Sequence, residues 1–226
     1  MFTLEQVVPY GRSFEEYLRM FDLNDVDLTR KIIGCGDGPA AFNAEATRRG
    51  ACVVSCDPVY RFQVDQIRRR IDEACDQVIL QTVLHADEFI WDPPVRNADE
   101  LRKVRMTAMN LFLDDFEQGL REGRYVDAEL PLLPYADGEF ELGLCSHLLF
   151  LYSEQLGEEF HRKAIRELCR VAREVRIFPT TGLDSRESPH LEICIGDLKS
   201  AGLEATVQQV PYEFHRGANR VLRIRR

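Results

Sequence analysis

The residues Lys31-Ile32-Ile33-Gly34-Cys35-Gly36-Asp37-Gly38-Pro39 give the clearest structural signal in the chain. It predicts a short buried strand, then a glycine-rich turn, then a helix that begins at Pro39. Because glycine has no Cβ, Gly34, Gly36 and Gly38 let the backbone turn tightly and approach a ligand closely. Proline suits the first position of a helix, where its missing N–H leaves no hydrogen bond unmade. The free N–H groups of that helix would face a polar or anionic ligand.

A second strand and a carboxylate follow the turn at the distance that a nucleoside site requires. Residues 51–56 predict the strand, and Asp57 follows it directly. This places Asp57 about 20 residues after the glycines, where a carboxylate can bind the hydroxyl groups of a ribose. The whole stretch therefore predicts a nucleoside-binding β-α-β unit. A dinucleotide fingerprint would have its third glycine at the position of Pro39, which disfavours a dinucleotide.

Composition predicts a single domain that covers residues 1–226. The hydrophobic content of 45% is enough for one sizeable core, and the net charge of −9 provides no field that attracts nucleic acid or an anionic membrane. No apolar run approaches membrane-spanning length, and the first residues lack the pattern of a signal peptide. Seven cysteines without C-x-x-C pairs predict neither a disulfide framework nor a metal site. We expect a cytoplasmic protein in which Cys52 and Cys56 are buried on one face of a strand.

The N-terminal region, residues 1–28, predicts a short helical flap ahead of the first strand. Ser13 and Glu16 have the spacing of a capping box, and apolar residues follow at helical intervals. The preceding turn, residues 9–12, ends with Arg12. Two interpretations remain open: a plain surface turn, or a flap whose Arg12 reaches the carboxylate of a bound ligand.

Residues 60–124 contain no strand-like run and two apolar stripes at helical spacing. One helix would be enough to connect two parallel strands, so the surplus, residues 78–119, predicts a helical insertion. We expect this insertion near the carboxyl ends of the strands, where α/β proteins bind ligands. The alternative is a structural buttress or the contact face of a homodimer.

The remainder of the chain predicts three more strands of a parallel sheet and a closing hairpin. Helices are expected at residues 154–172 and, after a Ser188-Pro189 cap, up to Gly202. The hairpin pairs residues 204–210 with residues 220–225. The three parallel strands are expected at residues 124–127, from Glu141 to Ser146, and at residues 175–178.

Two motifs resemble those of the class I S-adenosylmethionine (SAM) dependent methyltransferases. The G-x-G-x-G spacing resembles the first motif of that family, and the run from Asp127 to His147 resembles the third and fourth motifs. The resemblance covers nearly the whole chain except the insertion and the first residues, and it is to a divergent, uncharacterised bacterial methyltransferase-like branch. It implies a three-layer Rossmann-like α/β fold with a mostly parallel sheet, a C-terminal antiparallel hairpin and the helical insertion.

The resemblance also implies a SAM site and a small-molecule methyl acceptor. Asp57 would hold the ribose, Asp127 would contact the adenine amino group, and Ala128 and Glu129 would lie along the base. Ser146 and His147 would face the methionine part, with His147 as the candidate general base. No metal is expected. The positions assigned to the cofactor are Arg12, Gly34, Cys35, Gly36, Asp57, Pro58, Asp127, Ala128, Glu129 and Ser146.

Three functions remain open because the sequence departs from the family pattern. Ile32 stands where family members usually have a carboxylate for the cofactor's amino group, Glu141 replaces the usual aspartate, and Gly143 interrupts the fourth strand. The first function is a SAM-dependent methyltransferase that acts on a small molecule by in-line transfer. The second is a non-catalytic protein that binds SAM or a nucleoside, and the third is a nucleotide-linked oxidoreductase.

Overall fold

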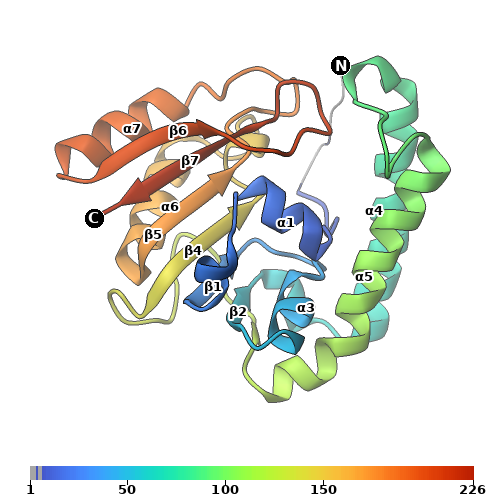
Figure 1. Ribbon diagram of the computed structural model, residues 1–226, viewed down its shortest axis with the longest axis horizontal. Helices are drawn as coiled ribbons and strands as arrows, with labels where there is room; N and C mark the ends of the chain where they lie inside the picture. The colour runs from blue at the N-terminus through green and yellow to red at the C-terminus, as the bar shows by residue number, and fades with distance from the viewer. Residues whose placement is uncertain (1–3, 5–6) are drawn as a thin grey trace.

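The computed structural model describes Leu4 and residues 7–226, and a seven-stranded sheet runs through this part of the chain (Figure 1). The strand order is β3-β2-β1-β4-β5-β7-β6. All neighbours pair in parallel except β7, which is antiparallel to both β5 and β6. This confirms the predicted fold class, including the C-terminal hairpin. The bounds are β1 (Lys31–Cys35), β2 (Cys52–Cys56), β3 (Tyr125–Val126), β4 (Phe140–Ser146), β5 (Ala172–Phe178), β6 (Glu204–Gln209) and β7 (Arg220–Arg225).

Helices cover both faces of the sheet, and the alternation of side chains along β1 shows how. Ile32 joins the cluster under α1 (Phe14–Met20) and α3 (Phe42–Arg48), whereas Ile33 joins the cluster under α6 (Glu158–Val171) and α7 (Leu191–Ser200). The result is three layers. Among the described helices, none is long and apolar enough to cross a membrane. Shorter helical turns are α2 (Asp25–Leu28), η1 (Pro58–Arg61), η2 (Ala86–Glu88) and η3 (Phe150–Tyr152).

Two long helices, α4 (Val64–Leu84) and α5 (Ala98–Arg121), run side by side at one edge of the molecule (Figure 1). Helix α5 also contacts α3 and β3, so it occupies the crossover position and α4 lies outside it. The two predicted apolar stripes face each other, with Ile71 and Phe112 in one core cluster. The predicted insertion, residues 78–119, begins inside α4 and ends inside α5.

The segment between α4 and α5 is joined to the loop between β6 and β7. The N–H of Ile90 donates to the carbonyl of Phe214 (2.8 Å), and the N–H of Arg216 donates to the carbonyl of Glu88 (2.9 Å). This loop lies near the carboxyl end of β5, because Thr180 donates its N–H to the carbonyl of Arg220 at 3.2 Å. The helical pair therefore reaches over the carboxyl ends of the strands.

A buried ion pair between Arg105 and Glu16 connects α5 to α1. Their side chains are only 2% and 8% exposed. Glu16 also accepts hydrogen bonds from the N–H of Ser13 (2.9 Å) and the hydroxyl of Tyr212 (2.9 Å). Burial alone would raise the pKa of Glu16, but the charge and hydrogen bond of Arg105 outweigh burial and lower that pKa to about 2. One carboxylate thus holds together α1, α5 and the loop that follows β6.

Helix α3 begins at Phe42, so the prediction that it begins at Pro39 is wrong. Gly36 and Gly38 have φ angles of 71° and 53°, and this left-handed backbone delays the helix by a turn. The prediction that Cys52 is buried is also wrong. The edge strand β3 pairs only with Ser55 and Cys56, which leaves the start of β2 uncovered.

Three further boundaries differ from the predictions. Helix α6 begins at Glu158 rather than at residue 154, and α7 begins at Leu191 with His190 as its N-cap rather than at Ser188-Pro189. Strand β4 continues without interruption through Gly143. A Cβ at that position would lie 3.1 Å from the Cβ of Ala172, so the glycine allows close packing instead of ending the strand.

Replacement of Arg105 by methionine should destabilise the protein by about 3–5 kcal/mol, because it leaves the Glu16 carboxylate buried without its counter-ion. Chemical denaturation of the wild type and the Arg105→Met variant measures the difference. Lys163→Met is the matched control, since it breaks an exposed pair with Glu159 on α6 and should change the unfolding midpoint little. Equal effects of the two variants would contradict the role given to the buried pair.

Candidate functional site

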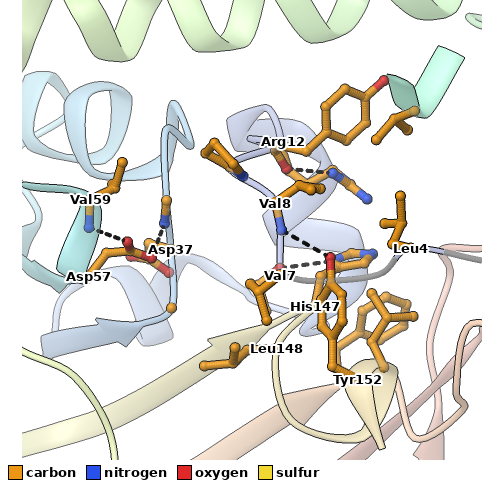
Figure 2. A pocket seen from close by; sticks show the side chains of 18 of the residues that line it. Leu4, Val7, Val8, Arg12, Asp37, Asp57, Val59, His147, Leu148 and Tyr152 are labelled. Carbon is orange, nitrogen blue, oxygen red and sulfur yellow. Dashed lines mark hydrogen bonds between the residues drawn. The ribbon is translucent and has the colours of Figure 1, made fainter. Parts of the chain in front are cut away.

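A cavity of about 510 Å³ lies at the carboxyl ends of β1, β2, β4 and β5. Its walls also include residues 7–10, side chains of α4 and α5, and the loop between β6 and β7. Figure 2 shows Asp37, Asp57 and Val59 on one side of it, and His147, Tyr152 and Leu4 on the other. The volume is typical of a site for a small organic molecule. In the described part of the chain, no group of side chains has the arrangement of a metal site.

The cavity brings together many, but not all, of the residues predicted for the site. Gly34 and Cys35 lie in β1 behind the turn, and Asp127 and Ala128 are not among the lining residues. Asp127 instead forms a half-exposed ion pair (3.1 Å) with Arg61, which does line the cavity. The predicted residues that line it are Arg12, Gly36, Asp57, Pro58, Glu129, Ser146 and His147.

Asp57 holds the glycine turn in place. One oxygen of its carboxylate accepts the N–H of Gly38 (2.9 Å), and the other accepts the N–H of Val59 (2.8 Å; Figure 2). Burial outweighs these two bonds and raises the pKa of Asp57 to about 6. Because a carboxylate oxygen has a second lone pair, Asp57 can still accept hydroxyl groups of a ligand.

Asp37 is a site residue that the sequence analysis missed. Its carboxylate accepts hydrogen bonds from the hydroxyls of Tyr17 (2.9 Å) and Ser55 (2.6 Å). The Asp37 carboxylate folds back so closely over Gly34 that a Cβ at position 34 would collide with it, so only glycine fits there. Burial raises the pKa of Asp37 to about 6. The sequence signal that could have identified Asp37 is its position between two glycines at the end of a buried strand.

His147 follows β4 in a strained backbone conformation. Its φ angle of 50° is left-handed, which is unusual for a residue with a side chain and is often found at functional sites. Its Nδ1 hydrogen-bonds with the hydroxyl of Ser146 (2.9 Å), and its ring lines the cavity. Burial, with the nearby charges of Arg12 and Arg105, holds the pKa of His147 well below its usual value. The imidazole is therefore neutral near pH 7.

Arg12 and Tyr10 have polar atoms that the protein leaves unsatisfied. Arg12 donates one hydrogen bond, from Nη1 to the carbonyl of Tyr10 (2.7 Å), and its Nε is buried without a partner. Among the described residues it has no ion-pair partner. The hydroxyl of Tyr10 is also buried without a partner, and burial raises its pKa to about 12, so it stays protonated. Both groups are donors that fit an oxygen atom of a ligand.

The Asp37→Asn variant should be more stable than the wild type at pH 7.5, by roughly 1–3 kcal/mol. The pKa of Asp37 rises from its usual value of 3.8 to about 6 on folding, so the folded protein binds the proton more tightly than the unfolded chain. Stability from this group is therefore lost as the pH rises from about 4 to about 6. Urea denaturation across this pH range should show that the free energy of unfolding falls less for the variant than for the wild type. A less stable variant with an unchanged pH dependence would contradict this account.

Comparison with known proteins gives one whole-length relative and several distant structural neighbours. The chain is 32% identical over 227 residues to "Uncharacterized protein MJ0045" of Methanocaldococcus jannaschii, covering 99% of this chain and 98% of that protein. No protein-family model matches the chain.

The structural neighbours are similar only at a low level. Magnesium protoporphyrin IX methyltransferase (ChlM) from Synechocystis PCC 6803, solved with bound SAM, has a TM-score of 0.44 at 13% identity, covering 89% of this chain and 73% of that one. A SAM dependent methyltransferase from Aquifex aeolicus has a TM-score of 0.41 at 14% identity, covering 92% and 90%. Since the identity to the Methanocaldococcus jannaschii protein extends over the whole length, the chain belongs to one family with MJ0045, and its strand order is that of the Rossmann-like methyltransferase fold.

Proposed function

We propose that the protein is a SAM-dependent methyltransferase that acts on a small molecule. The observation that carries this proposal is the meeting of three groups in one cavity. These are the glycine turn after β1, the carboxylate of Asp57 after β2, and the guanidinium of Arg12, whose Nε is buried and which has no ion-pair partner in the described chain. A nucleoside that also carries a carboxylate group fits this combination.

The residues present fit SAM in each of its parts. The unsatisfied Nε of Arg12 suits the carboxylate of the methionine part, as a charge-assisted hydrogen bond. Asp37 suits the amino group. Its carboxylate would replace the one that family members usually have at the position of Ile32. Asp57 suits the ribose hydroxyls. Glu129 and Leu130 follow β3 at the end of the cavity where the adenine would lie.

When bound, SAM supplies a methyl group on a positively charged sulfur. The protein's own task is to hold an acceptor in line with that methyl group and to exclude water, which is a proximity effect. In the tautomer of His147 whose Nδ1–H donates to the hydroxyl of Ser146, Nε2 of the neutral imidazole can accept a proton from the acceptor. An uncharged imidazole is also compatible with a nearby sulfonium, because it adds no repulsive charge.

Two other functions predict different binding. A non-catalytic protein of this fold would bind SAM or a nucleoside with no acceptor. A nucleotide-linked oxidoreductase would bind NAD(H), which Pro39 disfavours at the third position of a dinucleotide fingerprint.

Calorimetric titration with SAM, S-adenosylhomocysteine and NAD(H) tests the proposal. We expect saturable binding of the first two, as the glycine turn and Asp57 complement adenosine and Arg12 complements the carboxylate. Binding of NAD(H) should be much weaker. Tight binding of NAD(H) without binding of SAM would favour the oxidoreductase and reject the methyltransferase.

The Asp57→Ala variant should bind S-adenosylhomocysteine more weakly by about 1.5–3 kcal/mol, the range for hydrogen bonds to a charged group. Calorimetry on a variant with wild-type circular dichroism measures this. Asp127→Ala is the matched control and should change the affinity little, because Asp127 itself does not line the cavity, although its partner Arg61 does. A folded Asp57→Ala variant with unchanged affinity would show that the ribose binds elsewhere.

A further inference from the structure

The cavity has an apolar end that the proposed cofactor does not need. This end lies beyond His147, on the side of the cavity away from Asp57 (Figure 2). It is formed by parts of the chain that are far apart in sequence: residues 8–10 with Leu4, α4 and the segment after it, α5, η3 with its flanks, and the loops after β5 and β6. Its lining residues include Val8, Tyr10, Phe89, Leu101, Tyr152 and Phe214.

Aromatic rings dominate one wall of this apolar end. Phe89 and Phe214 line the cavity with ring centroids 5.1 Å apart, and Trp91 supports both from behind at 6.4 and 5.8 Å. The ring of Tyr10 lies nearby, between the guanidinium groups of Arg12 (5.2 Å) and Arg105 (5.6 Å). Rings arranged in this way favour the edge or face of another aromatic ring.

The charges around the apolar end disfavour a cationic acceptor. Among the described lining residues, the carboxylates are Asp37, Asp57 and Glu129, which follow β1, β2 and β3 at the other end. The charges that lower the pKa of His147 include those of the cations Arg12 and Arg105, and Glu16 is already paired with Arg105. Glu88 lies behind His215, which it contacts at 3.6 Å. An ammonium group would therefore be desolvated here without a counter-charge.

Few polar atoms at this end are available to an acceptor. Among the described residues that line this end, the polar side-chain atoms include Nε2 of His147, the hydroxyl of Tyr10, which has no partner, and the hydroxyl of Tyr152, which accepts the N–H of Val8 (3.4 Å). The hydroxyl of Thr82 donates to the carbonyl of Val78 (2.7 Å), and the buried Nε of Arg105 is a further donor without a partner. One proton acceptor beside a small number of donors suits a single hydroxyl group. An acceptor with many polar groups would leave them unsatisfied.

We propose that the methyl acceptor is a phenol, with its ring against Phe89 and Phe214 and its hydroxyl at Nε2 of His147. This rests on the proposed function. In the transfer, the phenol oxygen forms a bond to the methyl carbon while the S–C bond of the donor breaks and its electron pair stays on sulfur. The phenol proton moves to Nε2 of His147. Phenols are acidic enough for a weak base, which suits a neutral imidazole in this environment.

The single tryptophan of the chain, Trp91, provides a direct readout, since it packs on both rings of the wall. With the protein saturated with S-adenosylhomocysteine, 4-nitrophenol should quench Trp91 fluorescence in a saturable way. Free N-acetyltryptophanamide corrects for light absorption by the probe. Two compounds of the same size serve as controls: 4-nitrobenzylamine, which carries a positive charge, and 4-nitrotoluene, which lacks the hydroxyl. We expect each to bind at least about tenfold more weakly, because a mispaired polar group is costly in a buried site.

Two variants test whether 4-nitrophenol binds at the apolar end of the cavity. Phe214→Ala removes one ring of the wall and should weaken 4-nitrophenol binding by about tenfold, with little change for S-adenosylhomocysteine. Leu80→Ala on the exposed face of α4 is the matched control and should change neither. Equal or tighter binding of the amine, or no binding of 4-nitrophenol to protein that holds S-adenosylhomocysteine, would overturn this inference alone. Failure to bind S-adenosylhomocysteine would overturn the proposed function and this inference with it.

Discussion

The hydrogen bonds of Asp57 to the N–H groups of Gly38 and Val59 are the constraint on which the site depends. They connect the turn after β1 to the start of η1 after β2, so the two strand ends act as one unit. With the turn held in its left-handed conformation, Asp37 folds back over Gly34 and meets Tyr17 of α1. Two carboxylates are thereby buried close together, with pKa values of about 6. Burying two carboxylates close together is unfavourable for stability, and carboxylates with raised pKa values are typical of functional sites. A ligand with hydroxyl and amino groups could bind to both.

The second half of the cavity depends on contacts between distant parts of the chain. Arg105 and Glu16 join α5 to α1, and the backbone bonds at Phe214 and Glu88 join the helical pair to the C-terminal hairpin. These contacts place apolar side chains of α4 and α5 opposite the strand ends. The site therefore combines a polar floor, given by the strand ends, with an apolar roof that has few polar atoms. Such a combination suits a polar cofactor and a much less polar second molecule.

The local elements could be predicted because their signals are local. The capping box at Ser13, the glycine turn and the closing hairpin each depend on residues close in sequence, and the structure has all three. The prediction that α3 begins at Pro39 was wrong, because the left-handed backbone at Gly36 and Gly38 outweighs the preference of proline for the first turn of a helix. The role of Asp37 was missed because it depends on Tyr17 and Ser55, which come from two other elements. The partner of Arg105 and the aromatic wall are also tertiary contacts, which no periodicity in the sequence predicts.

A crystal structure of the protein with S-adenosylhomocysteine would show where the ligand binds. We expect the nucleoside in the cavity with its ribose hydroxyls at Asp57, its amino group toward Asp37 and its carboxylate at the buried Nε of Arg12. The sulfur should then point toward His147 and the apolar end. A nucleoside bound elsewhere, or bound in the reverse direction with its carboxylate toward β3, would contradict the account.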